Sequence, residues 1–156
     1  LPISKSIIKE ALCVLGKKHF AFISHANSFP AEHGKNTGFG TNNSTSAKNL
    51  MNFLSGVFTD IQLGPSGKTK SIDASPYTGT IFSNNPLFVD LKELTTKKWD
   101  CILSEETFNR IVEENPNKDI AKTAYTYIYK AQETALKEAY ANFKTSENLK
   151  KARGER

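Results

Sequence analysis

Apolar residues recur every three or four positions in the first stretch of the chain, from residue 3 to residue 15. This spacing places them on one face of a helix, and Gly16 gives that helix a natural end. Residues 19–25 differ, because they form a compact apolar run flanked by turn residues, which is typical of a buried strand. The pattern therefore predicts a short amphipathic helix followed by a buried strand.

A Gly- and Asn-rich loop follows and runs to residue 43. The next helix begins at Ser44 or Ser46, either of which offers a side-chain oxygen as an N-cap, and Gly56 ends it. Its predicted buried stripe is Ala47, Leu50, Met51 and Leu54. Residues 57–63 then form the next strand. A strand, a helix and a strand joined by short links predict a parallel, right-handed unit.

Helical patterns replace strand patterns after residue 86. Ser104 opens a short helix with two acids in its first turn, where they favour the helix dipole, and Pro116 stops it. A long helix is predicted from 119 to 144, and residues 145–147 resemble the cap of one more. Aromatic residues at helical spacing are more typical of core packing than of chemistry. The predicted inward positions are Phe108, Ile111, Val112, Ala124, Tyr125, Ile128, Ala131, Ala135, Leu136, Ala139, Tyr140 and Phe143.

The composition is that of a soluble globular protein: 156 residues, 38% hydrophobic and 24% charged. No apolar run approaches the roughly 20 residues that cross a membrane, so we expect no membrane partner. Cys13 and Cys101 stand in apolar surroundings without a partner motif, which predicts two small buried residues in a reducing compartment, the cytoplasm. A disulfide between them remains the alternative.

The net charge of +5 raises the possibility of a nucleic-acid partner. Most basic residues are interleaved with acids, however, and the densest basic cluster lies at residues 150–156. A frayed end or a solvated helix face explains that cluster better than a groove that follows phosphates. We therefore expect no nucleic-acid partner, and a basic helical protein that binds RNA is the weakest of three hypotheses.

Four short motifs carry the strongest functional signal. They are His-Ala-Asn-Ser-Phe-Pro at 25–30, Leu-Gly-Pro-Ser-Gly at 63–67, Ser-Pro-Tyr at 75–77 and Asn-Pro at 85–86. In this order they resemble the N-terminal portion of the 4-alpha-glucanotransferase family, the amylomaltases or disproportionating enzymes. The similarity extends over about residues 20–145. Ala74 interrupts the Asp-Ser-Pro-Tyr of the family, and Asn84 replaces its Gly before Asn-Pro.

The resemblance implies an α/β fold, the first two strands of a (β/α)8 TIM barrel with a mostly helical insertion subdomain. Residues 1–18 would then be a helical extension, 19–85 the first βαβ portion of the barrel, and 86–156 the insertion. Two strands cannot close a barrel, so we expect exposed strand edges and apolar faces. On this basis we also expect the chain to be part of a longer enzyme and to be marginally stable alone.

The resemblance also implies a substrate site at Tyr77, Ser75 and Asp73. A glucose ring has an apolar face and a hydroxyl rim, so its site pairs an aromatic ring with small polar groups. Tyr77 supplies the ring, Pro76 fixes the backbone before it, and Ser75 adds a hydroxyl, while Asp73 positions one. The alternative for Tyr77 is a surface residue packed on its own loop. We expect His25 and Asp60 to be structural.

Family members transfer α-1,4-glucan segments between maltodextrins by a retaining mechanism, which needs two carboxyl groups about 5–5.5 Å apart. The family's Arg-x-Asp, Glu-Asp-Leu-Gly and Thr-His-Asp-Asn segments do not occur in this sequence. We therefore expect a glucan-binding portion that has no catalytic residue of its own, needs no metal or cofactor, and is inactive alone. The alternative is a stand-alone or degenerate carbohydrate-binding module.

Overall fold

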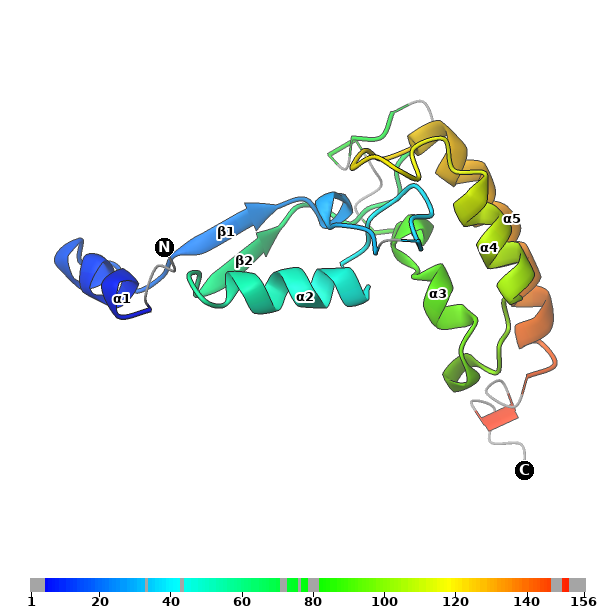
Figure 1. The fold of residues 1–156 in the computed structure, drawn as a ribbon, viewed down its shortest axis with the longest axis horizontal. Helices are drawn as coiled ribbons and strands as arrows, with labels where there is room; N and C mark the ends of the chain where they lie inside the picture. The colour runs from blue at the N-terminus through cyan, green and yellow to red at the C-terminus, as the bar shows by residue number, and fades with distance from the viewer. Residues whose placement is uncertain are drawn as a thin grey trace.

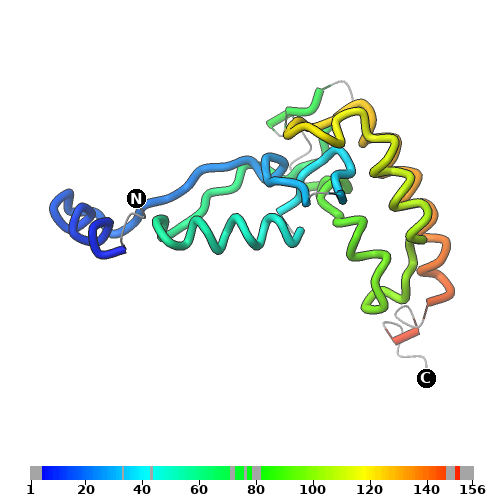
Figure 2. Tube along the Cα trace, viewed as in Figure 1, coloured from blue at the N-terminus to red at the C-terminus, as the bar shows by residue number. Residues whose placement is uncertain are grey.

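The computed structural model describes residues 5–32, 34–42, 44–70, 73–75, 77–78, 82–146 and 150–151. The molecule is elongated (Figure 1), with helix α1 (Lys5–Val14) at one end and the last helices gathered at the other. The Cα trace in Figure 2 follows the same path from the first helix, through two strands and a helix, to the helical end. The structure combines helices with one parallel strand pair, which confirms the predicted α/β fold class.

Strand β1 (Ala21–Ser24) pairs in parallel with strand β2 (Asp60–Leu63), as predicted, with Ala21 opposite Asp60 and Ser24 opposite Leu63. Between them lie the 3-10 turn η1 (Ala26–Ser28) and helix α2 (Thr45–Leu54). Ser44, one of two candidates, is the N-cap, since its Oγ accepts a hydrogen bond from the Ala47 amide at 3.1 Å. β2 starts later than predicted because residues 55–58 still close the end of α2: the amides of Val57 and Phe58 both bond to Leu54.

The prediction that β1 is buried is wrong. Its residues are exposed or half-buried in alternation, and Ile23 is 72% exposed. On the opposite face, Phe22 packs against the ring of Phe58, with centroids 5.3 Å apart. A strand is buried only when layers cover both faces of its sheet, and here one face of β1 is open. The exposed Ile23 therefore belongs to an apolar face that the described residues leave uncovered.

The predicted N-terminal helix is present as α1, and a turn that contains Gly16, whose φ is +63°, follows its last residue, Val14. No residue of α1 is buried, because the helix projects from the end of the molecule (Figure 1). Cys13 on this helix is therefore exposed, and Cys101 is exposed too, in a turn where its φ is +49°. The predicted burial of both cysteines is therefore wrong. Both thiols are free, so the alternative of a disulfide between them is not what the structure shows. Ile3, also assigned to this helix, lies outside the described residues.

The helical half begins with η2 (Pro86–Phe88), α3 (Leu91–Leu94) and η3 (Lys97–Trp99) and continues with α4 (Glu105–Glu113) and α5 (Tyr125–Phe143). The predicted cap of α4 is confirmed, since Ser104 Oγ accepts from the Thr107 amide at 3.2 Å. Helices α4 and α5 contact each other and enclose most of one apolar core. The buried core residues are Leu91, Leu94, Ile102, Leu103, Phe108, Ile111, Val112, Ala135 and Ala139.

Helix α5 starts six residues later than predicted, because residues 117–122 form turns. Just before it, the Ala124 amide donates to the Gly38 carbonyl at 2.7 Å, which ties the helix start to the loop after β1. Tyr140, predicted to be in the core, is 64% exposed. The further helix predicted from residue 145 falls largely on residues 147–149, which lie outside the described residues. None of the helices in the described part of the chain combines the length and the hydrophobicity that crossing a membrane requires.

Asn85 lies between the helical half and the part of the chain before it, which contains β1, α2 and β2 and is called the strand half below. Asn85 is 6% exposed. Its Nδ2 donates to Thr69 Oγ1 at 3.2 Å, and its Oδ1 accepts from the Leu87 amide at 3.1 Å. Thr69 in turn shares a hydrogen bond with the hydroxyl of Tyr129 on α5. The loop after β2 is thereby fixed to η2 and to the long helix.

Candidate functional site

The two parallel strands end at the same edge of the sheet, and His25 and Gly64 are the residues that follow them. The Gly64 amide extends the pairing by donating to the Ser24 carbonyl at 3.3 Å. A Cβ on Gly64 would lie 2.5 Å from Nδ1 of His25, closer than such contacts allow. Glycine at this position therefore lets the imidazole lie directly against the end of β2.

Tyr77 lies edge-on to the ring of His25, with centroids 5.8 Å apart and planes at 85°. This is a favoured geometry for two aromatic rings, since the positive edge of one meets the negative face of the other. Tyr77 is nevertheless 69% exposed. The contact with His25 orients the phenol ring while leaving most of its surface open to a ligand.

The three predicted substrate-binding residues lie together in the loop that carries Tyr77. Asp73 Oδ1 accepts from the Ser75 amide at 3.0 Å, and Ser75 Oγ accepts from the Tyr77 amide at 3.4 Å. The Ser75 amide, and then the Thr78 hydroxyl, hold the pKa of the Asp73 carboxyl below its usual range. Asp73 therefore shapes the loop as an ionised acceptor of local hydrogen bonds. Pro76, predicted to fix this backbone, lies outside the described residues.

A cavity of about 320 Å³ opens at the same edge of the sheet. Its volume is at the lower end of the range for small-molecule sites in proteins. Gly64 lines it and lies close to His25, whose ring contacts Tyr77, so His25 connects the exposed Tyr77 ring to the residues of the cavity. The lining residues are Ala26, Asn42, Leu63, Gly64, Ser66, Asn84, Asn85 and Phe88.

The cavity is lined by uncharged groups, namely apolar side chains, asparagine amides and a serine hydroxyl. Such a surface can bind a ligand through hydrogen bonds and apolar contact, and it favours a neutral ligand over an ion. In the described ranges, no three His, Cys, Asp or Glu side chains lie where they could hold a metal ion together.

A family model described as 4-alpha-glucanotransferase matches residues 25–155, which is most of the chain. The chain belongs to this family. The match begins at His25, so the 4-alpha-glucanotransferase region includes the cavity, the Tyr77 loop and the whole helical half, whereas α1 precedes it. The resemblance inferred from the four motifs is thus confirmed. Comparisons with curated proteins and with solved structures gave no match.

His25 was expected to be a structural histidine, and its role stays a prediction. The residue is exposed, and its ring contacts the ring of Tyr77. The available signal was its position, because residues at the carboxyl end of a parallel strand line the site edge of an α/β sheet. Its contact with Tyr77 joins segments far apart in the sequence, which no local pattern indicates.

Proposed function

We propose that this chain supplies the glucan-binding portion of a 4-alpha-glucanotransferase that transfers α-1,4-glucan segments between maltodextrins by a retaining mechanism. The observation that carries this proposal is the exposed Tyr77 ring, oriented by His25, which in turn lies close to Gly64 in the lining of a neutral cavity of about 320 Å³. The proposal gives the α-glucan substrate class of the family to these particular residues. It places the protein in the cytoplasm, with maltodextrin as its partner.

Sugar binding explains why an aromatic ring and small polar groups meet at this edge. The apolar face of a glucose ring stacks on the exposed phenol of Tyr77, and its hydroxyl rim takes hydrogen bonds from the Tyr77 hydroxyl, Ser75 and the amide of Asn84. A bound glucan covers the cavity mouth and displaces water. Water exclusion matters for a transferase, because transfer to a sugar competes with hydrolysis of the bound intermediate.

We assign binding, and not bond cleavage, to this chain. Retaining transfer uses a nucleophilic carboxylate and an acid–base carboxyl group about 5–5.5 Å apart across the scissile bond. Asp73, the acid nearest to Tyr77 in the loop, is engaged by the Ser75 amide and the Thr78 hydroxyl. The carboxyl pair would come from residues outside this sequence, and the chain alone would be inactive.

The same proposal assigns β1 and β2 to the first two strands of a (β/α)8 barrel. The parallel pairing and the open face that carries Ile23 support this assignment, because further strands would cover that face. Residues 19–85 would be the first βαβ portion, residues 86–156 the helical insertion, and residues 1–18 an extension.

Titration of the 156-residue chain with maltoheptaose, followed by calorimetry, tests the binding site. We expect Tyr77→Ala to weaken binding by tenfold or more, because the stacking surface is lost, and Tyr77→Phe to retain most of the affinity. Tyr140→Ala is the matched control, since Tyr140 is comparably exposed but lies on α5. Equal losses in the two alanine variants, or no binding by the parent chain, would contradict the proposal.

A second variant tests the orientation of the ring. Gly64→Ala places a Cβ where Nδ1 of His25 now lies, so the imidazole must move away from Tyr77. We expect maltoheptaose binding to fall severalfold while the helical half keeps its fold, with Gly56→Ala at the end of α2 as the control. Disproportionation of maltotriose by the unmodified chain would show that it holds its own catalytic groups and would overturn the assignment to binding alone.

A further inference from the structure

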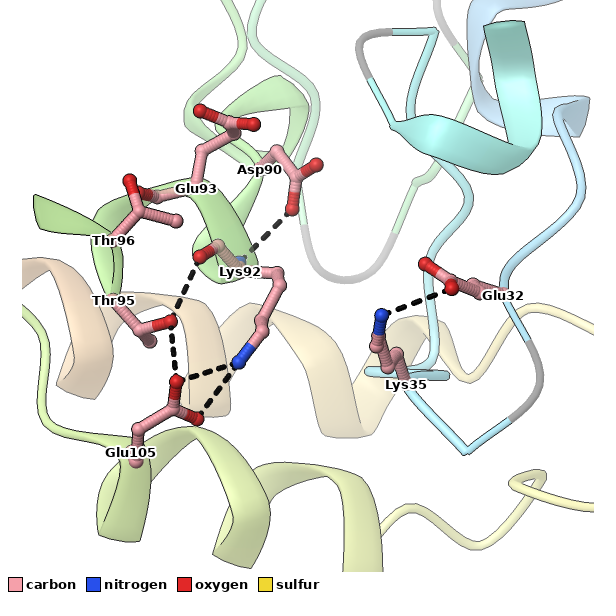
Figure 3. Close-up of polar contacts among 8 residues, drawn as sticks. All are labelled: Glu32, Lys35, Asp90, Lys92, Glu93, Thr95, Thr96 and Glu105. Carbon is pink, nitrogen blue, oxygen red and sulfur yellow. Dashed lines mark hydrogen bonds and ion pairs between the residues drawn. The ribbon is translucent and has the colours of Figure 1, made fainter. Parts of the chain in front are cut away.

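A second cavity, of about 80 Å³, lies between the loop that follows β1 and the helices of the other half. Figure 3 shows Glu32 and Lys35 on the loop side, facing Asp90 and Lys92 on the helical side across the gap. Thr41, Phe39 and Gln132 are among its other lining residues. It shares no lining residue with the cavity beside Gly64, so the two are separate sites.

Thr41 gives the first indication of a ligand. It is 8% exposed, and its Oγ1 is buried without a hydrogen-bond partner among the described residues. A buried hydroxyl left unpaired costs free energy, so a group that bonds to it would be stabilised in this cavity. The Thr41 carbonyl, in contrast, accepts from the amide and the hydroxyl of Ser44.

Both lysines that line the cavity are already paired with carboxylates, which disfavours an anionic ligand. Lys35 Nζ lies 2.9 Å from Glu32 Oε1, and Lys92 Nζ lies 2.6 Å from Glu105 Oε1 (Figure 3). An anionic ligand would have to compete with these carboxylates. Asp90 accepts from the Lys92 amide through Oδ1 at 2.9 Å. An uncharged hydroxyl group can donate to a carboxylate or accept from Thr41 without disturbing either pair.

The size of the cavity sets the size of the ligand. One water needs about 10–15 Å³ by the same measure, so a space of about 80 Å³ holds several groups of that size. It is too small for the several sugar units that the cavity beside Gly64 could contact. Phe39 and Phe108 line the cavity as well and offer apolar surface to a sugar or polyol carbon skeleton.

We propose that this cavity binds one uncharged, hydroxyl-rich small molecule, a polyol or a single monosaccharide, through the Thr41 hydroxyl and the Asp90 carboxylate. This accessory site is distinct from the glucan site at the strand ends and does not depend on it. Occupancy would link the loop after β1 to α3 and α5, because Asp90 caps α3 and Gln132 belongs to α5.

Glucose is the probe for this proposal, titrated into the isotope-labelled chain while the Thr41 and Asp90 amide signals are followed by NMR. Thr41→Val keeps the shape and removes the hydroxyl, and we expect it to weaken glucose binding about fivefold to tenfold. Thr41→Ser restores the hydroxyl and should restore binding. Thr134→Val, on the exposed face of α5, is the control and should bind as the parent does.

The results separate this site from the glucan site. Glucose binding that is lost in Thr41→Val but kept in Tyr77→Ala supports the proposal, whether or not maltoheptaose binds at Tyr77. Binding lost in Tyr77→Ala and unchanged in Thr41→Val would overturn it, as would the absence of glucose binding at millimolar concentration, which would leave a cavity for water only. If Thr41→Val does not fold, Asp90→Asn, which can still cap α3, takes its place with the same expected loss.

Discussion

The strand half and the helical half contain similar apolar side chains but bury them to very different extents. Ile128 of α5 is fully buried, whereas Ile23 of β1 is 72% exposed. In the helical half, α3, α4 and α5 contact one another and cover each other's apolar faces. In the strand half, one face of the sheet has no such cover. The comparison shows that burial here depends on how many layers surround a residue, and not on its own hydrophobicity.

Truncating one isoleucine in each half gives the largest expected contrast. Ile128→Ala should lower the free energy of unfolding by about 2–5 kcal/mol, because it removes buried methyl groups and leaves a cavity. Ile23→Ala makes the same chemical change on the open face, and it should alter stability by no more than about 0.5 kcal/mol. Urea unfolding followed by circular dichroism measures both. Similar losses would mean that the face of β1 is covered in solution.

Removing the Asn85 hydrogen bonds that link the two halves should lower the free energy of unfolding by an intermediate amount. Asn85→Ala removes the hydrogen bonds to Thr69 and to the Leu87 amide. Thr69 keeps its bond to Tyr129, but the buried Leu87 amide loses its acceptor, which should cost about 1–3 kcal/mol. Amide hydrogen exchange should then show faster opening of the loop after β2 than of α5. Asn84→Ala, at the exposed neighbouring position, is the control. Uniform acceleration across both halves would show that they unfold as one unit.

The smallest expected effect is electrostatic and lies at the start of β2. The Thr59 hydroxyl, and then the His19 side chain, hold the pKa of Asp60 below its usual value. The folded state therefore binds this proton less readily than the unfolded state. The resulting stability is present above about pH 4 and is lost as the pH falls through the lowered pKa.

Asp60→Asn should accordingly make the stability of the protein fall less steeply as the pH drops below about 4. The change should be small, because the Asp60 carboxylate is exposed and its interactions are screened. Thermal melts from pH 5 to about pH 2 of this variant and of Asp119→Asn, a surface control in the helical half, measure the difference. An unchanged slope in Asp60→Asn would mean that the pair with His19 does not persist in solution.

Several features of the helices could be predicted from the sequence, because local signals determine them. Ser44 and Ser104 cap their helices through side-chain oxygens, and the spacing of Phe108, Ile111 and Val112 placed them in the core. Each of these features depends on residues a few positions apart. The domain boundaries at residues 18 and 85 stay predictions.

Some of the errors concern the cover that distant segments provide, and others are local. The hydrophobicity of β1 suggested burial, but burial requires a second layer that a local pattern does not reveal. Cys101 is exposed although Ile102 and Leu103 next to it are buried. The late starts of β2 and α5 are local, because turns at residues 55–58 and 117–122 precede them.

Some features of the candidate site could also be predicted from local sequence, whereas others needed the structure. Asp73, Ser75 and Tyr77 lie in one loop and could be grouped from the sequence. The contact of His25 with Tyr77, and the unpaired hydroxyl of Thr41 beside Asp90, join distant segments and needed the structure.

The exposure of both cysteines makes the natural sequence suitable for an optical distance measurement. The chain contains two cysteines, one on α1 and one in the helical half, and both thiols are free and exposed. A donor and an acceptor fluorophore can therefore be attached through maleimide chemistry without any substitution. Energy transfer between the dyes would then report the separation of the two ends of the molecule, with and without maltodextrin.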